Sequence, residues 1–340
     1  MELLRRRAYA RAGLVGNPSD GYFGKTISLT LKNFWAEVVL YEWDEIEIVL
    51  SQDDRSRFGS VQDLVHDVRL HGYYGGVRLV KATIKRFVEF CQQNAIALHD
   101  RNFSVRYQSN IPRQVGLAGS SAIIVATLRA LIDFYHVEIP QQVLPSLALS
   151  IESGELGIAA GLQDRVIQVY GGLVYMDFAK ERMTQQMGLA CGVYEPLDPH
   201  ILPPLYLAFS PEVGEPTEVL HNPLRARFLA GDPAVIAAMQ KFAGLAAEAY
   251  EALEQSDVPR LSALMDENFN TRRSICQLAA SHIQMIEVAR AVGASAKFAG
   301  SGGAIIGVCF DDAMFARLQN DLGQIGCQVI RPMLDLPGNT

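Results

Sequence analysis

The sequence is poor in the residues that build disulfide frameworks and metal centres. It has five cysteines and seven histidines in 340 residues, and no two cysteines form a Cys-x-x-Cys pair. The cysteines are scattered, mostly in apolar surroundings, at positions 91, 191, 276, 309 and 327. This pattern predicts small buried thiols in a reducing cytoplasm rather than disulfides. It also argues against a structural zinc site.

Long apolar runs and an excess of positive charge are missing as well. No stretch of about eighteen apolar residues occurs, so we expect no membrane crossing and no membrane partner. The formal net charge is −7, which does not favour a nucleic-acid partner. The arginines at 5–7 precede no long apolar stretch. We therefore expect no signal peptide and a cytoplasmic location.

Strand and helix patterns intermix along the chain without a regular βαβ repeat. In the first part, strands are predicted at 26–32, 34–40, 45–50, 103–107 and 171–178, and helices at 79–95, 122–135 and 142–152, the last interrupted by Pro145. A proline-rich stretch at 196–204 is typical of a linker. Beyond it, helices are predicted at 233–256, 258–277, 281–292 and 312–322, and strands at 205–209, 304–310 and 328–331. The pattern predicts an α+β fold with two domains, residues 1–195 and 200–340.

Residues 112–123 form the most informative segment. Small residues crowd together immediately before the apolar run that begins a helix. Small residues let backbone N–H groups approach an anion, and the N-terminus of a helix favours phosphate. Ser120 and Ser121 add hydroxyls for phosphate oxygens or a metal. The segment predicts a nucleotide-phosphate site, and the alternative is an ordinary Gly-Ser turn that caps a helix.

A second cluster of small residues spans 300–304, next to a predicted strand. Glycine loses much conformational entropy when the chain folds. A glycine-rich run is therefore expected where the backbone passes close to a ligand or to another loop. A flexible hairpin turn is the alternative.

Charged residues lie between these two loops in the sequence. Glu152, Asp164 and Arg165 bracket a small-residue loop at 157–161. Phosphoryl transfer uses one carboxylate to hold Mg²⁺ and another to accept the proton of the attacking hydroxyl. Taken alone, Asp164 and Arg165 would also fit a surface charge pair.

In order and spacing, these segments resemble the GHMP kinase superfamily. Residues 115–122 resemble its second motif, the ATP-phosphate loop, and residues 297–304 resemble its third, glycine-rich motif. Residues 9–24 resemble the first motif, so the likeness covers nearly the whole chain. It implies a two-domain fold, with a ribosomal S5 domain 2-like N-terminal domain and a ferredoxin-like C-terminal domain. The active site is then expected in the cleft between them.

The resemblance implies roles for individual residues. Asp164, in a Gly-x-x-Asp sequence, matches the catalytic aspartate, and Arg11 occupies the basic position beside it. Glu152 and Ser121 match the residues of the Mg²⁺ site. ATP and Mg²⁺ are thus the implied cofactors. The residues expected to bind the ATP phosphates are Gly116, Leu117, Ala118, Gly119, Ser120, Ser121, Ala122, Gly300, Ser301 and Gly302.

Within the superfamily, the chain is most similar to the glucuronokinase branch, on residues 16–28, 116–122, 161–165 and 169–175. The phosphate loop has Leu-Ala-Gly at 117–119 where the superfamily usually has Gly-Leu-Gly, and this difference looks like a trait of that branch. The likeness implies transfer of the γ-phosphate to the anomeric hydroxyl of a sugar acid. D-glucuronate would then become glucuronate 1-phosphate.

Residues for the sugar follow in part from the same resemblance. Asp20 matches the aspartate that binds sugar hydroxyls in galactokinases, and Asn17 begins the same short segment. Tyr22 and Tyr175 are further candidates to line the sugar pocket. A uronate also brings a carboxylate, which calls for a cation, preferably an arginine fork. The candidates near the motifs are Arg165, Lys25 and Arg113, and the sequence does not choose among them.

Other functions stay open at this point. The acceptor could be another sugar, such as a heptose or galactose, or a small alcohol. The chain could also be a nucleotide-binding regulator without catalysis. A Rossmann-type dehydrogenase fits less well, because no Gly-x-Gly-x-x-Gly follows the first strand. The sequence leaves monomer and homodimer equally open.

Overall fold

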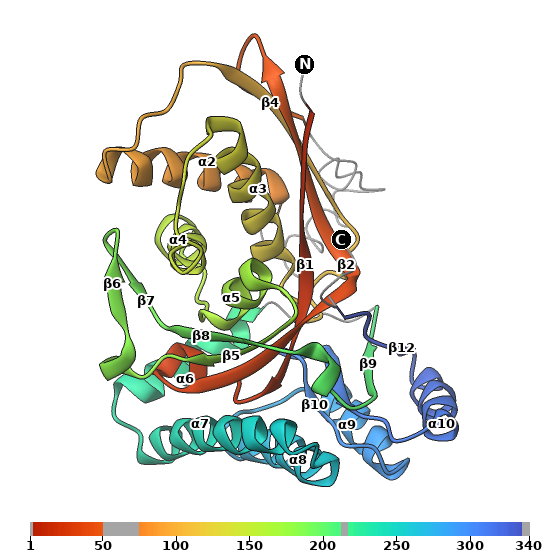
Figure 1. Cartoon of the computed structure of the whole chain (residues 1–340). Helices are drawn as coiled ribbons and strands as arrows, with labels where there is room; N and C mark the ends of the chain where they lie inside the picture. Colours follow the sequence, from red (N-terminus) through yellow and green to blue (C-terminus); the bar gives the residue numbers. More distant parts are fainter. Residues whose placement is uncertain (1–2, 50–74, 212–216, 335–340) are drawn as a thin grey trace, which may run out of the picture.

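The first half of the chain is built on a six-stranded sheet (Figure 1). A computed structural model describes residues 3–49, 75–211 and 217–334. The strands of this sheet are β1 (Leu3–Val15), β2 (Lys25–Trp43), β3 (Glu47–Val49), β4 (Asn102–Ser109), β5 (Leu173–Asp177) and β8 (Val193–Leu197). β1 pairs along one edge of the long strand β2, while β4 and β5 share its other edge. The strands predicted separately at 26–32 and 34–40 are therefore one continuous strand.

Helices cover one face of this sheet (Figure 1). They are α2 (Gly76–Gln93), α3 (Gly119–Tyr135), α4 (Leu144–Ser150) and α5 (Gln163–Tyr170). α3 packs directly on β1 and β2. Its apolar run, which includes Ile124, Val125 and Leu128, is buried, so a large core lies between α3 and the sheet. A small hairpin, β6 (Thr184–Gln186) and β7 (Leu189–Cys191), extends beside α4.

The prediction that Pro145 interrupts a helix at 142–152 was wrong. α4 begins at Leu144, with Pro145 in its first turn. A proline is tolerated there because the first N–H groups of a helix have no partner within the helix. The following residues, Ile151–Glu155, continue as one π-helical turn. This wider turn carries Glu152.

The second half contains a four-stranded sheet in the order β10-β11-β9-β12. Its strands are β9 (Leu205–Phe209), β10 (Lys297–Phe298), β11 (Ala304–Val308) and β12 (Gln328–Ile330). The helices of this half are α6 (Thr217–Leu229), α7 (Pro233–Glu254), α8 (Val258–Ile275), α9 (Ala280–Ala291) and α10 (Asp312–Gly323). α8 and α9 pack on β11, and α10 packs on β12. Phe269, Ile286 and Phe298 belong to the separate apolar core of this half.

Helix α7 joins the two halves, because it contacts β2 of the first sheet and also α8. The proline-rich stretch at 196–204 contains the end of β8 and a short 3₁₀ turn, Pro199–Ile201. It leads directly into β9, and the division at 195–200 stays a prediction. All five cysteines are free, and four of them are buried. No helix in the described ranges has the length and apolar character needed to span a membrane.

Candidate functional site

The loop before α3 makes a tight turn with left-handed backbone conformations. Gly116 and Ala118 both adopt the left-handed conformation, with φ of 72° and 63°. The carbonyl of Ala118 accepts a hydrogen bond from Gln168 Nε2 at 2.8 Å. Ser121, which is 1% exposed, donates to the same carbonyl at 3.2 Å. The loop therefore turns sharply into α3, whose first N–H groups are suited to phosphate.

The second glycine loop packs against the first. A Cβ atom added at Gly116 would lie 2.7 Å from the carbonyl oxygen of Gly302 and 3.0 Å from the amide nitrogen of Ser301. A Cβ at Gly300 would overlap the carbonyl oxygen of Gly116. Side chains would force these backbones apart, which explains the glycines at Gly116 and Gly300. The close approach expected for the run at 300–304 is thus confirmed.

Arg11 connects the two loops to Asp164. Its guanidinium donates two hydrogen bonds to the Asp164 carboxylate, from Nε at 2.6 Å and from Nη2 at 2.8 Å. Its Nη1 donates to the carbonyl of Gly116 at 2.5 Å and to that of Ala299 at 3.3 Å. Arg11 is 5% exposed. A single buried side chain therefore fixes the carboxylate of Asp164 beside both glycine-bearing segments.

Asp20 is almost fully buried and lies close enough to Asp164 to interact with its charge. Its carboxylate accepts hydrogen bonds from the backbone N–H and from Nε2 of Gln163, each at 3.2 Å. Burial raises the pKa of Asp20 to about 7, and the negative charge of Asp164 adds to the rise. A Cβ at Gly161 would overlap Oδ2 of Asp20, so the glycine leaves room for this carboxylate.

Arg165 and Glu152 form a buried ion pair. Arg165 Nε donates to Glu152 Oε2 at 2.5 Å, and Nη2 bonds the same oxygen. Arg165 Nη1 donates to the carbonyl of Gly161 at 2.7 Å and lies 3.6 Å from Asp164 Oδ2. Burial raises the pKa of Glu152, and Arg165 opposes that rise. Most of the guanidinium of Arg165 is thus already used by the protein.

Of the other residues predicted to contact a sugar, Asn17 and Tyr22 flank Asp20 in the sequence, whereas Tyr175 lies on β5 and has no contact with Asp20 among those seen in the described residues. Asn17 is buried, and within the described residues its Oδ1 has no hydrogen-bond partner. Tyr22 is half-buried, and its ring packs edge-on against Phe228 of α6 at 4.8 Å between centroids. Tyr175 packs on Tyr250 of α7 at 4.9 Å.

Sequence reasoning missed two residues of α8 that hold the site together. Asn268 accepts from the N–H of Gly16 at 2.7 Å and donates to the carbonyl of Asn17 at 3.0 Å. Arg272 donates to the carbonyls of Gly300 and Ser301, at 2.7 Å and 3.0 Å. Both side chains are buried. Their partners are distant in sequence, so no local pattern indicates these contacts.

Lys297 was part of the predicted third motif but had no role assigned to it. Its Nζ donates to the carbonyl of Gly13 at 2.6 Å and to that of Phe298 at 2.7 Å. Burial, followed by the charges of Arg272 and Arg11, holds the pKa of Lys297 well below the usual lysine value. Three buried basic side chains, Lys297, Arg11 and Arg272, thus donate hydrogen bonds to the backbone carbonyls at positions 298–301.

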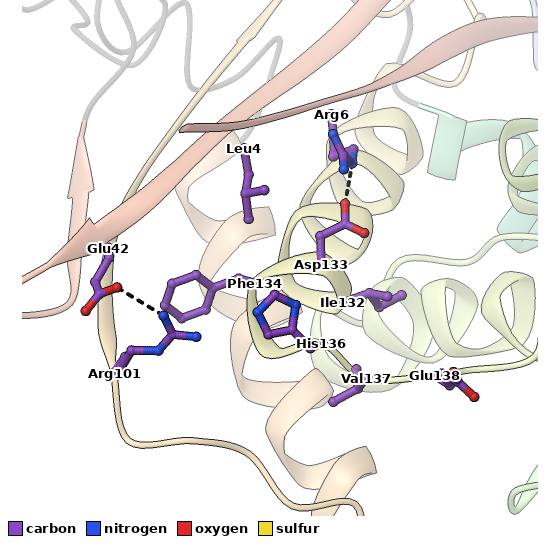
Figure 2. A pocket seen from close by; sticks show the side chains of 10 residues that line it. All are labelled: Leu4, Arg6, Glu42, Arg101, Ile132, Asp133, Phe134, His136, Val137 and Glu138. Carbon is purple, nitrogen blue, oxygen red and sulfur yellow. Dashed lines mark hydrogen bonds and ion pairs between the residues drawn. The ribbon is translucent and has the colours of Figure 1, made fainter. Parts of the chain in front are cut away.

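A cavity of about 400 Å³ lies elsewhere, at the C-terminal end of α3 (Figure 2). Figure 2 shows two ion pairs at its margin, Arg6 with Asp133 and Arg101 with Glu42. The phosphate loop is at the opposite end of α3, and a helix of 17 residues is about 25 Å long. The cavity is therefore distinct from the site around Asp164.

Comparison with known proteins places the chain in a family. The model of the GHMP kinases N terminal domain matches residues 78–172. Glucuronokinase 1 of Arabidopsis thaliana is 48% identical over 313 residues, which are 90% of this chain and 85% of that protein. Probable glucuronokinase 2 of the same plant is 47% identical over 90% of this chain and 84% of that protein.

Solved structures show the same fold. The galactokinase of Lactococcus lactis, complexed with galactose, has a TM-score of 0.73 at 14% identity and covers 98% of this chain and 94% of its own. This likeness confirms the two-domain GHMP kinase fold that the sequence predicted. The chain belongs to the GHMP kinase family, in the branch that includes the Arabidopsis glucuronokinases.

Proposed function

We propose that this chain is an ATP-dependent kinase that transfers the γ-phosphate to the anomeric hydroxyl of D-glucuronate. The observation that carries the proposal is the placement of Asp164. Arg11 donates hydrogen bonds both to the Asp164 carboxylate and to the carbonyl of Gly116, in the loop before α3. A carboxylate beside the phosphate loop is what a kinase needs to orient an attacking hydroxyl. The choice of substrate rests on the 48% identity with glucuronokinase 1.

In the proposed reaction, the anomeric oxygen of the sugar attacks the γ-phosphorus of ATP. An O–P bond forms to the sugar, the bond from the γ-phosphorus to the bridging oxygen breaks, and ADP leaves. The hydroxyl proton passes to the carboxylate of Asp164. The two hydrogen bonds from Arg11 hold that carboxylate in place, so it is oriented to receive the proton.

We further propose that Ser121 and Glu152 are the protein ligands of Mg²⁺. A hydroxyl and a carboxylate are the hard oxygen donors that this ion prefers, so the donor set fits. The described residues hold no cluster of three acidic, histidine or cysteine side chains suited to a metal. Phosphate oxygens and water would then complete the coordination. When bound, the ion neutralises negative charge on the phosphates.

The N–H groups at the start of α3 and the loop at 300–302 are proposed to bind the ATP phosphates. Asn17, Asp20, Tyr22 and Tyr175 are proposed to surround the sugar. Because Asp20 is buried and hydrogen-bonded to Gln163, its carboxylate is held in one position to accept sugar hydroxyls. Asn17 supports this arrangement through its unpartnered oxygen, which would face a donor on the ligand.

A screen of ADP release tests this function. The purified chain is incubated with ATP and Mg²⁺ and a panel of acceptors that contains D-glucuronate, D-galacturonate, D-glucose, D-galactose, a heptose and mevalonate. We expect D-glucuronate to give the highest kcat/KM, and EDTA to abolish its turnover. Release of ADP with another acceptor but none with D-glucuronate would refute the proposed substrate.

A further inference from the structure

The proposed substrate poses an electrostatic problem for this site. Asp164, Asp20 and Glu152 bring three carboxyl groups into one region, and a uronate adds a fourth. A carboxylate ligand in such surroundings requires a cation, and the planar guanidinium of arginine suits it best. The question is which cationic side chain is placed to bind it.

The sequence offered three cationic residues to bind the carboxylate of the sugar acid, and the structure shows where each of them lies. Arg165 uses its guanidinium on Glu152 and on the carbonyl of Gly161. Lys25 lies 3.7 Å from the carboxylate of Asp177, which is 1% exposed. Arg113 is exposed and stands three residues before Gly116, in the segment that leads into the phosphate loop. Arg165 and Lys25 thus each face a carboxylate of the protein itself, which leaves them less suited to a carboxylate of the ligand.

Helix α6 brings another arginine to the edge of the site. Phe228 of α6 packs against the ring of Tyr22 at 4.8 Å between centroids. Arg225 stands three residues earlier on α6, so it lies on the same face of the helix, one turn away. Arg225 is exposed, and its side chain takes part in no hydrogen bond or ion pair with the residues the structure describes.

We propose that Arg225 binds the carboxylate of the sugar acid and thereby sets the preference for uronates over neutral sugars. The inference rests on the proposed function and extends it to the residue that recognises the acid group. Tyr22 interacts electrostatically with both Asp20 and Arg225. In this proposal the buried Asp20 binds sugar hydroxyls, and the exposed Arg225 binds the carboxylate.

The electrostatic interactions of Tyr22 are consistent with a position of Arg225 near its phenol group. Burial raises the pKa of the Tyr22 phenol to about 12, the negative charge of Asp20 adds to the rise, and the positive charge of Arg225 opposes it. The phenol thus lies within the electrostatic reach of both side chains. The positive charge of Arg272 also opposes the rise of the Tyr22 pKa. Its two Nη groups, however, donate hydrogen bonds to the carbonyls of Gly300 and Ser301.

The test compares Arg225→Gln and Arg225→Lys with the wild-type chain on D-glucuronate and on D-glucuronamide, whose acid group is a neutral amide. Hydrogen bonds to charged groups are strong enough that we expect Arg225→Gln to lower kcat/KM for D-glucuronate about 30-fold, mainly through KM. The KM for ATP and kcat/KM for D-glucuronamide should stay within about twofold. Arg225→Lys should restore part of the loss, because lysine keeps the charge without the fork.

Arg273→Gln serves as the matched control. Arg273 is also an exposed arginine, and it pairs with Glu287 at 3.4 Å on the outer surface of α8. We expect wild-type kinetics from this variant. An unchanged kcat/KM of Arg225→Gln on D-glucuronate would overturn the inference. An equal loss on D-glucuronamide would also overturn it, because a merely structural role affects both substrates alike.

The same experiment separates this inference from the function on which it rests. If the wild-type chain turns over D-glucuronate and Arg225→Gln does so equally well, only the role of Arg225 fails. If the wild-type chain phosphorylates neutral sugars and leaves D-glucuronate untouched, the proposed function fails, and the role of Arg225 falls with it.

Discussion

Asn268 and Arg272 stand one helical turn apart on the buried face of α8, and each holds a different loop of the site. Asn268 bonds the backbone at Gly16 and Asn17, on the proposed sugar side. Arg272 bonds the carbonyls of Gly300 and Ser301, on the proposed nucleotide side. A single helix of the second half therefore fixes the distance between the two sides of the site.

Replacement of Arg272 should weaken ATP binding. In Arg272→Met, the carbonyls of Gly300 and Ser301 lose their donors, and the loop is free to turn away from the proposed phosphate site. We expect the KM for ATP to rise about tenfold, since each lost hydrogen bond to a charged donor costs about 1.5–3 kcal/mol and part of this loss is recovered by water. Steady-state kinetics at saturating sugar measures the effect.

The neighbouring substitution Arg273→Met provides the comparison. Arg273 is exposed and contacts Glu287 rather than the loop, so its loss should leave the KM for ATP unchanged. A wild-type KM for ATP in Arg272→Met would show that the glycine loop does not depend on this arginine.

A side chain at Gly300 should disrupt the contact between the two loops. The Cβ of Gly300→Ala would overlap the carbonyl oxygen of Gly116 and lie 2.8 Å from Arg11 Nη1. Because the neighbouring atoms are backbone and a buried cation, they cannot move away without disturbing Asp164. We expect kcat/KM for ATP to fall at least about 100-fold. Gly323→Ala, with no atom within 4 Å of the added Cβ, should behave as wild type. Activity of Gly300→Ala within about threefold of wild type would contradict the close packing.

The raised pKa of Asp20 predicts a pH-dependent change in stability. Burial, with the charge of Asp164, raises this pKa from 3.8 to about 7. A carboxyl group whose pKa is higher in the folded state stabilises the fold fully below its unfolded pKa, and that contribution is lost as the pH rises through about 7. Asp20→Asn does not ionise and avoids the loss. Its free energy of unfolding relative to wild type should therefore increase between pH 5 and pH 8, by on the order of 2–3 kcal/mol.

Urea denaturation of wild type and Asp20→Asn at these two pH values measures the difference. A relative stability that is constant, or that falls with pH, would mean that Asp20 is ionised throughout in the folded chain. The control is Asp198→Asn, since Asp198 is exposed and its pKa is lowered by hydrogen bonds from His200.

The turn into α3 was predictable from sequence because its signal is local, and phosphate binding by its residues stays a prediction. A run of small residues directly before an apolar run predicts a tight turn into a helix, and α3 begins at Gly119 within that run. The proximity of Arg11 to Asp164 followed only from the family resemblance. The ion pair itself joins strand β1 to helix α5, and no pattern within either element indicates the other.

The remaining contacts of the site depend on packing between distant elements. Arg272 lies near the end of α8 beside the exposed Arg273, where basic residues are common because they complement the helix dipole. Only the fold shows that one of the two arginines is buried. Glu152, the partner of Arg165, lies in the π-helical turn Ile151–Glu155, which the helical periodicity did not predict.

Phosphorus NMR of the reaction product, with wild type and Asp164→Asn compared, tests the central claim most directly. With ATP, Mg²⁺ and D-glucuronate, wild type should yield ADP and a single sugar phosphate whose phosphorus couples to the anomeric proton. Asp164→Asn should form this product at least about 1,000-fold more slowly while it binds ATP with an affinity within a fewfold of wild type. A phosphate on any other oxygen, or near-normal turnover by Asp164→Asn, would contradict the account.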